Sequence, residues 1–173
     1  KRPDRIDHRA VEAIRLAADA DIPGIVARSA ENRQVLFDID PFWETHVEAN
    51  TRFAGWMTQS LKLRDRDIMV MGSFENLDGY VIAQPASRLH FPAAHDIAGT
   101  GVLDDYYHAE LIDPTVLKNG GEGATALLRA GEAALAARGN CAAFVVCPAR
   151  WRSKVGVLET AGYETAMVWL IKR

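Results

Sequence analysis

The chain has 173 residues, of which 20 are basic and 23 acidic, and its net charge is -3 with a pI of about 6.0. This length predicts one domain with its own hydrophobic core, and the slightly acidic balance argues against a protein that binds nucleic acid over its whole surface. No apolar run approaches the roughly 20 residues of a membrane span, and the start of the chain is polar rather than an apolar signal segment. We therefore expect a cytoplasmic protein with a single domain over residues 1–173, a flexible or peripheral N-terminal segment over residues 1–12, and neither a membrane nor a nucleic-acid partner.

The two cysteines, Cys141 and Cys147, lie in or beside an apolar run. An extended step of six residues would hold their Cα atoms roughly 20 Å apart, which is too far for a disulfide. We expect two buried free thiols in a reducing compartment.

The N-terminal third predicts one short strand and two helices. A short apolar patch predicts a strand over residues 13–17. Asp19 and Asp21 precede Pro23, which is the pattern of a helix start, and a helical stripe continues to about residue 32. Apolar residues at steps of three and four predict a longer helix over residues 41–61. Its aromatic side chains either form core, as such stripes do more often, or line an acceptor pocket; they include Phe42, Phe53 and Trp56.

The middle of the chain predicts an antiparallel hairpin followed by a long loop. Two apolar runs, residues 68–74 and 80–83, flank a cluster of Asn, Asp and Gly. Residues 85–104 are punctuated by proline and glycine, and long irregular loops are often functional. We expect residues 87–101 to form an acceptor-side loop or lid, followed by a strand over residues 106–112.

The last third predicts two helices and two strands. A helix over residues 123–138 ends at Gly139. Residues 141–146 are apolar on both faces, which is typical of a central strand covered on both sides. A helix over residues 151–161 and a last strand over residues 163–172 complete the order β-α-α-β-β-β-α-β-α-β. This order predicts an α+β domain around one mixed, mostly antiparallel sheet flanked by helices.

A glycine-rich loop lies between the strand at 106–112 and the helix that follows, with glycines at 120, 121 and 123. Glycine lets the backbone approach a ligand closely. The first amides of a helix lack internal partners and carry the positive end of its dipole. The loop therefore predicts an anion site suited to phosphate. The alternative is an ordinary loop before a weak first helical turn, since short glycine patterns are common.

This stretch resembles the acyl-CoA motif of the GNAT superfamily of N-acyltransferases, Gln/Arg-x-x-Gly-x-Gly/Ala. Lys118 stands in the first place of the motif, and Gly121 and Gly123 stand in the glycine places. Ile112 and Pro114 match the apolar residue and the proline that precede the motif, with one extra residue before Lys118. The family's closing helix and its Gly-Phe end correspond to residues 155–163. The resemblance covers nearly the whole chain and implies the GNAT fold.

The resemblance implies acetyl-CoA as co-substrate and no resident metal. The pyrophosphate would lie against the amides of residues 119–124, and the pantetheine would pair like a strand with residues 111–113. Arg150, Arg152 and Lys154 would either pair with the phosphates or form a solvated helix face. The residues implied to bind the cofactor are Leu111, Ile112, Asp113, Lys118, Asn119, Gly120, Gly121, Glu122, Gly123, Ala124 and Arg152.

The implied chemistry is direct attack of a neutral amine on the thioester, which needs a base, donors that polarise the carbonyl, and a way to stabilise the departing thiolate. Alternation places Tyr106, His108 and Glu110 on one face of the expected strand, and the family commonly draws its base from this strand. We expect Glu110 or His108 to be the base. The alternatives are a solvated strand carboxylate and a half-buried structural histidine. The family's tyrosine acid corresponds to Leu158, so Tyr106 or Tyr163 would replace it, or the thiolate leaves unassisted.

The acceptor would be a primary amine on a small molecule or a peptide. Asp104, Asp105 and Glu110 near the expected mouth of the site favour a cationic acceptor. Dimers are common in the family, so the resemblance is also compatible with a homodimer.

Three other functions stay open. The departures at Leu158 and at Trp151, where the family often has an asparagine, favour a non-catalytic acyl-CoA sensor. A metal-dependent enzyme would use His90, His95 and His108, although no close pair has a familiar ligand spacing. A nucleotide-binding enzyme is the weakest alternative, because the P-loop and dinucleotide fingerprints are incomplete.

Overall fold

The computed structural model describes residues 14–91, 93–168 and 170. Within these residues, five strands form one sheet in the order β1-β2-β3-β4-β5. Neighbouring strands are antiparallel except β4 and β5, which are parallel. The elements in chain order are β1 (Ile14–Leu16), α1 (Ile22–Ile39), α2 (Ala49–Ser60), β2 (Asp67–Ser73), β3 (Asn76–Pro85), β4 (Thr100–His108), α3 (Glu122–Ala137), β5 (Ala142–Phe144) and α4 (Arg152–Thr160).

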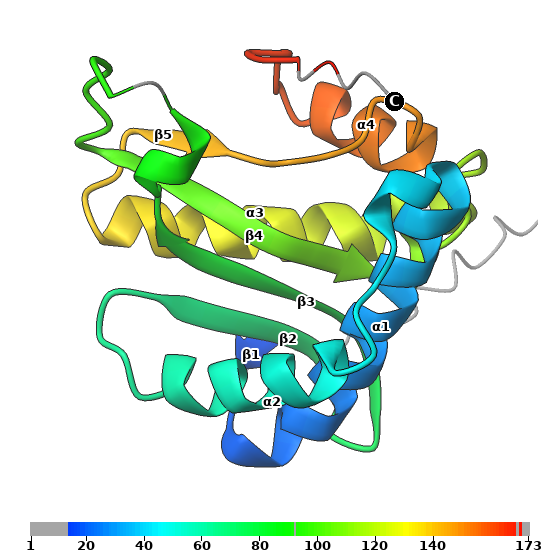
Figure 1. Ribbon diagram of the computed structural model, residues 1–173. Helices are drawn as coiled ribbons and strands as arrows, with labels where there is room; N and C mark the ends of the chain where they lie inside the picture. The colour runs from blue at the N-terminus through cyan, green and yellow to red at the C-terminus, as the bar shows by residue number, and fades with distance from the viewer. Residues whose placement is uncertain (1–13, 92, 169, 171–173) are drawn as a thin grey trace, which may run out of the picture.

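The helices cover the sheet from both sides. Helix α3 lies along one face, and α1 and α2 lie on the other (Figure 1). One apolar cluster fills the α3 side and includes Leu127, Leu135 and, from α4, Val157. A second cluster fills the α1–α2 side and includes Ile25 and Met57. The predicted α+β fold around one mixed, mostly antiparallel sheet is confirmed. None of the helices within the described residues is long and apolar enough to cross a bilayer.

A buried carboxylate joins β1 to the start of α1. Asp21 is 1% exposed and accepts hydrogen bonds from Arg15 Nη1 and Nη2, both at 2.7 Å, and from the Ala18 amide at 2.8 Å. The hydrogen bonds from Arg15, with the Ala18 amide and the Arg15 charge, hold the pKa of Asp21 below its usual value against the opposing effect of burial. The predicted helix start at Asp21 and Pro23 is confirmed.

The helix boundaries differ from those predicted around Asp40. Helix α1 continues to Ile39 because Val35 is buried one turn beyond the expected end. The single helix predicted over residues 41–61 is wrong: the structure has a short 3-10 helix at Pro41–Trp43, and α2 begins only at Ala49. A residue before proline is driven out of the helical conformation, and Asp40 is extended, with its carboxylate accepting the Phe42 amide at 2.8 Å.

The hairpin of β2 and β3 is confirmed, but β4 starts earlier than predicted. It runs over Thr100–His108 rather than residues 106–112, and Ala109–Leu111 form a 3-10 helix. Gly101 explains the earlier start, because a Cβ there would lie 2.5–3.0 Å from the side chain of Leu135 on α3. The sheet and α3 can therefore approach closely only at a glycine. The expected loop is shortened to the residues before Thr100.

The C-terminal part departs most from the prediction. Residues 163–168 form no strand, and residues 169 and 171–173 of the predicted last strand lie outside the described residues, as does the predicted peripheral segment. Among the residues that the structure describes, β5 is therefore a short edge strand rather than a central one, and Val146 beyond it is 47% exposed. Both cysteines are free, but Cys141 is exposed and Cys147 only partly buried, so the prediction of two buried thiols was wrong for Cys141.

The contact at Asp21 generates a test of the fold. Asp21→Asn should lower the free energy of unfolding by about 2 kcal/mol near neutral pH, because it removes a charge that accepts three hydrogen bonds. Since the pKa of Asp21 is lowered in the folded state, its contribution is present above the unfolded pKa of about 4 and is lost as the pH falls through the folded value.

Urea unfolding of the wild type and of Asp21→Asn, at neutral and at acidic pH, would measure the difference in their free energies of unfolding. Asp19→Asn, at an exposed carboxylate two residues away, is the matched control. The stabilising role of Asp21 would be contradicted if Asp19→Asn lowered the free energy of unfolding equally. It would also be contradicted if the difference between the wild type and Asp21→Asn did not become smaller at acidic pH.

Candidate active site

The strands β4 and β5 separate partway along β4, at one edge of the sheet. Within the described residues they pair at three positions, the last of which joins Val102 to Phe144. Beyond this point the chain after β5 runs toward α4, while β4 continues beside β3 (Figure 1). The backbone groups on this side of β4 lose their strand partner, and buried carbonyls need other donors.

Side chains at the start of α4 supply these donors. Lys154 Nζ donates to the Tyr106 carbonyl at 2.6 Å, and Trp151 Nε1 donates to the Leu111 carbonyl at 2.8 Å. Ser153 Oγ reaches the carbonyls of Leu111 at 3.3 Å and Asp113 at 2.7 Å. A hydroxyl has one hydrogen to donate and a carbonyl oxygen has two lone pairs, so the Leu111 and Asp113 carbonyls each accept one of these bonds and keep a second lone pair. The segment expected to pair with pantetheine, residues 111–113, therefore retains acceptor capacity.

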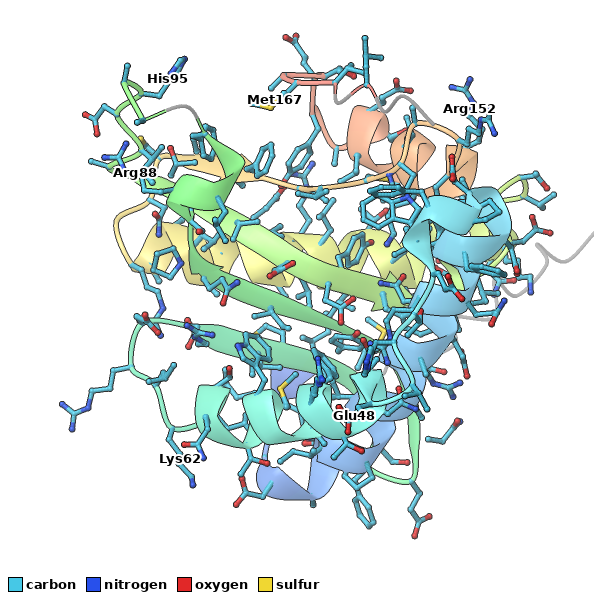
Figure 2. The ribbon with its side chains drawn as sticks, in the orientation of Figure 1. Glu48, Lys62, Arg88, His95, Arg152 and Met167 are labelled. Atoms are coloured by element: carbon cyan, nitrogen blue, oxygen red, sulfur yellow. The ribbon has the colours of Figure 1, made fainter. Side chains whose placement is uncertain are left out.

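Lys154 is neither a phosphate-binding surface residue nor part of a solvated face. It is 4% exposed, and its Nζ lies 4.1 Å from the centroid of the Trp151 ring. Burial lowers the pKa of Lys154, against the smaller opposing effects of Cys147 and Asp105. Arg152, by contrast, is exposed and points outward at the end of the molecule where α4 approaches α1 (Figure 2).

The predicted anion loop is a left-handed turn. Asn119, Gly120 and Gly121 have φ values of 48°, 66° and 73°, and Gly121 caps α3. A Cβ on Gly120 would meet nothing within 4 Å, whereas one on Gly121 would lie 3.0–3.1 Å from Leu117 and Val157. Gly120 is therefore glycine for its backbone conformation, and the turn is open above it. Lys118, Asn119, Gly120 and Glu122 are all exposed.

Gly123 has a packing role instead. A Cβ on it would lie 2.6 Å from His108 Cε1 and 3.4 Å from Glu110 Oε2. This position is glycine because β4 and the 3-10 helix after it press against the first turn of α3.

The three expected catalytic residues do gather on one side of β4, beneath that first turn. Tyr106 Oη donates to the Ala124 carbonyl at 2.5 Å, and Glu110 Oε2 accepts the Ala124 amide at 3.0 Å. Glu110 is 9% exposed, and a carboxylate at a helix N-terminus is favoured by the helix dipole. The Ala124 amide expected to face a phosphate is thus occupied by this chain's own carboxylate.

His108 is held as a neutral imidazole in this cluster. Its Nδ1 accepts the Glu110 amide at 3.2 Å, so it cannot also donate to Glu110 Oε2, which lies 3.4 Å away. Its Nε2 lies 3.4 Å from Met71 Sδ. Burial lowers the pKa of His108, and the Glu110 charge only partly offsets this. The contacts of Glu110 and His108 with the first turn of α3 indicate a structural role, which is to fix the position of the helix N-terminus.

A pocket of about 320 Å³ opens on the opposite face of β4. We call it the α1–α2 pocket. It is lined by Ser29 and Arg33 from α1, Phe53 and Trp56 from α2, Ile82 from β3, and Asp104 and Asp105 from β4. Two of the aromatic residues that the sequence placed either in the core or at an acceptor site therefore line a cavity.

Asp105 is built into this pocket by a bulge in β4. The register between β3 and β4 shifts between Tyr80 and Ile82, and Asp105 has a φ of 45°. Its carboxylate accepts Tyr80 Oη at 2.5 Å, Ser29 Oγ at 2.8 Å and Asn32 Nδ2 at 2.8 Å. Burial, and then the Asp105 charge, raise the pKa of Tyr80 well above its usual value.

Asp104 lies next to it, and its carboxylate accepts Gln84 Nε2 and the Asp105 amide, both at 2.9 Å. From the sequence, Asp104 and Asp105 are expected only as acidic groups near the mouth of the site, and nothing in the sequence marks Arg33. The sequence does contain one sign of this site, which is the pair of aspartates inside a strand. Aspartate is depleted in strands, and it tolerates the left-handed conformation of a bulge position.

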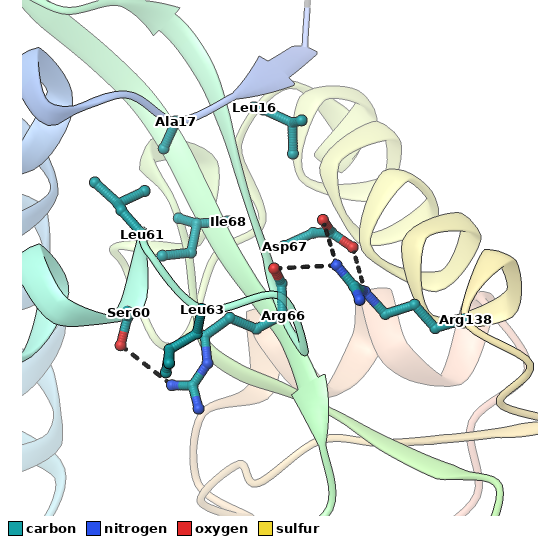
Figure 3. Close-up of a pocket in the computed structure, with 9 residues that line it drawn as sticks. All are labelled: Leu16, Ala17, Ser60, Leu61, Leu63, Arg66, Asp67, Ile68 and Arg138. Carbon is teal, nitrogen blue, oxygen red and sulfur yellow. Dashed lines mark hydrogen bonds and ion pairs between the residues drawn. The ribbon is translucent and has the colours of Figure 1, made fainter.

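A second pocket, of about 200 Å³, lies between β1, the loop before β2 and the end of α3 (Figure 3). Arg138 donates there to both oxygens of Asp67, at 2.7 and 2.9 Å, and to the carbonyls of Arg64 and Arg66. Arg66 in turn donates to Ser60 Oγ. These charges are satisfied within the protein, so the contact is a clamp between α3 and β2. None of the expected site residues lines it.

Two histidines of the metal hypothesis, His95 and His108, do not come together, and the side chain of the third, His90, lies outside the described part of the chain. No group of three or more His, Cys, Asp or Glu side chains able to hold a metal exists among the described residues. His95 lies on the loop before β4, near Arg88 (Figure 2), and His108 ends that strand. A nine-residue strand separates its two ends by roughly 25 Å.

Comparison with known proteins supports the fold. No family model and no curated protein sequence matches the chain. Among solved structures, a predicted acetyltransferase from Clostridium acetobutylicum, crystallised with acetyl-CoA, has 18% identity and a TM-score of 0.64 over 93% of this chain and 95% of that one. Glucosamine-6-phosphate N-acetyltransferase from Arabidopsis thaliana has 12% identity and a TM-score of 0.60 over 93% and 97%. The tetramutant of the BH1408 protein from Bacillus halodurans has 11% identity and a TM-score of 0.71 over 93% and 99%. The chain thus has the GNAT fold, as the sequence resemblance implied.

The contact between Glu110 and α3 generates a second test. Glu110→Ala should lower the free energy of unfolding by about 1–2 kcal/mol, because it leaves the buried Ala124 amide without its acceptor and removes a favourable charge from the helix start. Urea unfolding at neutral pH would measure the loss. Glu122→Ala, at an exposed carboxylate in the same helical turn, should change stability by less than about 0.5 kcal/mol. Equal effects of the two substitutions would refute the cap.

Proposed function

We propose that this GNAT-fold chain transfers an acetyl group from acetyl-CoA to a primary amine. The observation that carries the proposal is the separation of the parallel strands β4 and β5 after Val102 and Phe144, in a chain where an open left-handed turn begins α3. A solved structure with this fold contains acetyl-CoA. The two features offer a slot for an extended chain and amides for a pyrophosphate, as the resemblance to the family implies.

We place the pyrophosphate at the turn of residues 119–123. Left-handed residues and the first helical amides present N–H groups to an anion, and the helix dipole favours negative charge there. The exposed Lys118 and Arg152 would add positive charge at either side. Ala124 is left out of the site because Glu110 holds its amide. The pantetheine would pair with the backbone of residues 111–113, where the carbonyls that accept Trp151 and Ser153 each keep a second lone pair.

In the proposed reaction the amine nitrogen attacks the thioester carbonyl. A C–N bond forms, the C–S bond breaks, the amine loses a proton and the CoA thiolate gains one. The sequence favoured Glu110 or His108 as the proton acceptor. Both contact α3 in the structure, whereas Asp104 and Asp105 line the pocket on the other face of β4. We therefore place the amine, and acceptance of its proton, at Asp104 and Asp105.

We further propose that the thiolate leaves without a tyrosine acid. Leu158, at the position of the family's tyrosine, lies in the apolar cluster on the α3 side. Tyr106 Oη donates to the Ala124 carbonyl. Tyr163 packs against the same cluster, and burial, with the neighbouring Glu132 of α3, raises the pKa of its hydroxyl.

A non-catalytic acyl-CoA-binding domain is the second candidate, and the buried Leu158 is the observation that favours it. The two functions differ in one readout. A sensor would bind acetyl-CoA but release no thiol in the presence of any amine, whereas a transferase would release CoA in proportion to the amine supplied.

Calorimetric titration with acetyl-CoA tests the proposed cofactor site. Gly120→Glu should weaken binding by about tenfold or more, because a side chain above the open turn adds bulk and negative charge where the pyrophosphate would lie. Gly139→Glu is the matched control: Gly139 also has a positive φ, 83°, and an unobstructed Cβ direction, but it follows the other end of α3. Equal weakening by both variants, or no binding by the wild type, would sink the proposed site.

Measurement of CoA release in the presence of an amine tests the leaving step. Tyr163→Phe should keep kcat within about twofold of the wild-type value, because burial and the neighbouring Glu132 raise the pKa of this hydroxyl and so make it a poor proton donor to the thiolate. A fall of about a hundredfold or more, without a change in the acetyl-CoA affinity, would instead identify Tyr163 as the acid.

A further inference from the structure

The α1–α2 pocket carries charges of both signs on neighbouring walls. Asp104 and Asp105 form the acidic wall, and the guanidinium of Arg33 lies at the other side of Ser29. The Ser29 hydroxyl accepts Arg33 Nη1 at 2.5 Å and donates to Asp105 Oδ2 at 2.8 Å. One hydroxyl therefore separates the guanidinium of Arg33 from the carboxylate of Asp105. The two groups form no direct ion pair with each other, and each can contact a ligand in the pocket.

Arg33 is ordered but not neutralised. Its Nη2 donates to Asn50 Oδ1 at 2.5 Å, and its guanidinium carbon lies 5.6 Å from the centroid of the Phe53 ring. No salt bridge joins it to a carboxylate among the residues that the structure describes. Its buried Nε also lacks a hydrogen-bond partner among them. A buried donor left unpaired is costly, and a carboxylate is the group that a guanidinium binds best.

The third wall is aromatic. The rings of Phe53 and Trp56 stack with centroids 5.8 Å apart and planes at 16°, and Trp56 is 38% exposed. Ile82 extends the apolar surface from the sheet. A ligand held by its charged groups between Arg33 and the aspartates would lay its remaining atoms against this surface.

We propose that the α1–α2 pocket binds an amine that also carries a carboxylate, of the kind found in a free amino acid with an apolar side chain. The amine lies at Asp104 and Asp105, the carboxylate at Arg33, and the side chain against Phe53 and Trp56. The inference rests on the proposed function, because it names the acceptor class for that transfer. The spacing supports an α-amino acid, since a single hydroxyl separates the two charged protein groups and one carbon separates the two charged groups of the ligand.

Trp56 provides a readout that needs no acetyl-CoA. L-Phenylalanine and L-leucine should quench its fluorescence, and each should bind about tenfold or more tightly than the amine that lacks its carboxylate, phenethylamine or isoamylamine. 3-Phenylpropionate, which lacks the amine, should bind as weakly as phenethylamine. The Trp56→Phe variant assigns the signal, because it should abolish the quenching.

Arg33→Gln should remove the advantage of the amino acids and leave the affinity for phenethylamine unchanged. Arg52→Gln, an exposed arginine on α2 that pairs with Glu48 outside the pocket, should change neither. The proposal is overturned if phenethylamine binds as tightly as L-phenylalanine, if neither amino acid quenches Trp56, or if Arg33→Gln weakens both ligands alike.

The experiments distinguish a failure of the proposed function from a failure of this inference. Loss of acetyl-CoA binding would be seen by calorimetry, whereas the pocket is measured with no CoA present. If acetyl-CoA binds and phenethylamine releases CoA faster than L-phenylalanine at equal concentration, the transferase stands and the amino-acid assignment falls.

Discussion

The rest of the structure depends on a simple requirement: when β5 leaves β4, the carbonyls of β4 and of the segment that follows it must find new donors. The chain meets this requirement with the side chains at the start of α4. Trp151, Ser153 and Lys154 together hold the carbonyls of Tyr106, Leu111 and Asp113. The separation of the strands is therefore a built feature with its own hydrogen bonds, and α4 is fixed across it. A cofactor that entered here would meet an ordered wall, with the backbone of residues 111–113 as its partner.

The two faces of β4 have different tasks. Tyr106, His108 and Glu110 contact the first turn of α3 and set the position of the left-handed turn before it. Asp105 belongs to the other face because of the bulge. A left-handed conformation costs a non-glycine residue roughly 1–2 kcal/mol, and the three hydrogen bonds to the Asp105 carboxylate offset this cost. The strained backbone thus lies at the residue whose carboxylate points into the pocket, and strained residues of this kind cluster at functional sites.

The α1–α2 pocket owes its charge pattern to three elements that are distant in the sequence. Arg33 comes from α1, the stacked aromatic pair from α2, and the carboxylates from β4. Ser29 contacts both the guanidinium and Asp105 and so fixes their relative positions. A pocket with separate positive, negative and apolar walls can discriminate by leaving a charge unpaired when the wrong ligand binds, which costs more than the loss of an apolar contact. This is the physical basis for expecting selectivity for a zwitterion over a simple amine.

The sequence by itself determined the features that rest on local patterns. The Asp21 and Pro23 helix start, the hairpin of β2 and β3, the glycine turn before α3 and the α+β fold class all follow from short-range preferences, and the structure agrees. The resemblance at Lys118–Gly123 implied the GNAT fold, which solved structures with identities of only 11–18% share. Only the tertiary structure decided the start of β4, because close packing of Leu135 against Gly101 joins residues far apart in the chain. It also decided that Lys154 is buried, that Glu110 caps α3, and that Arg33 meets Asp105 through Ser29. Each of these is a contact between segments whose sequences carry no mark of the other, so no local preference could have revealed it.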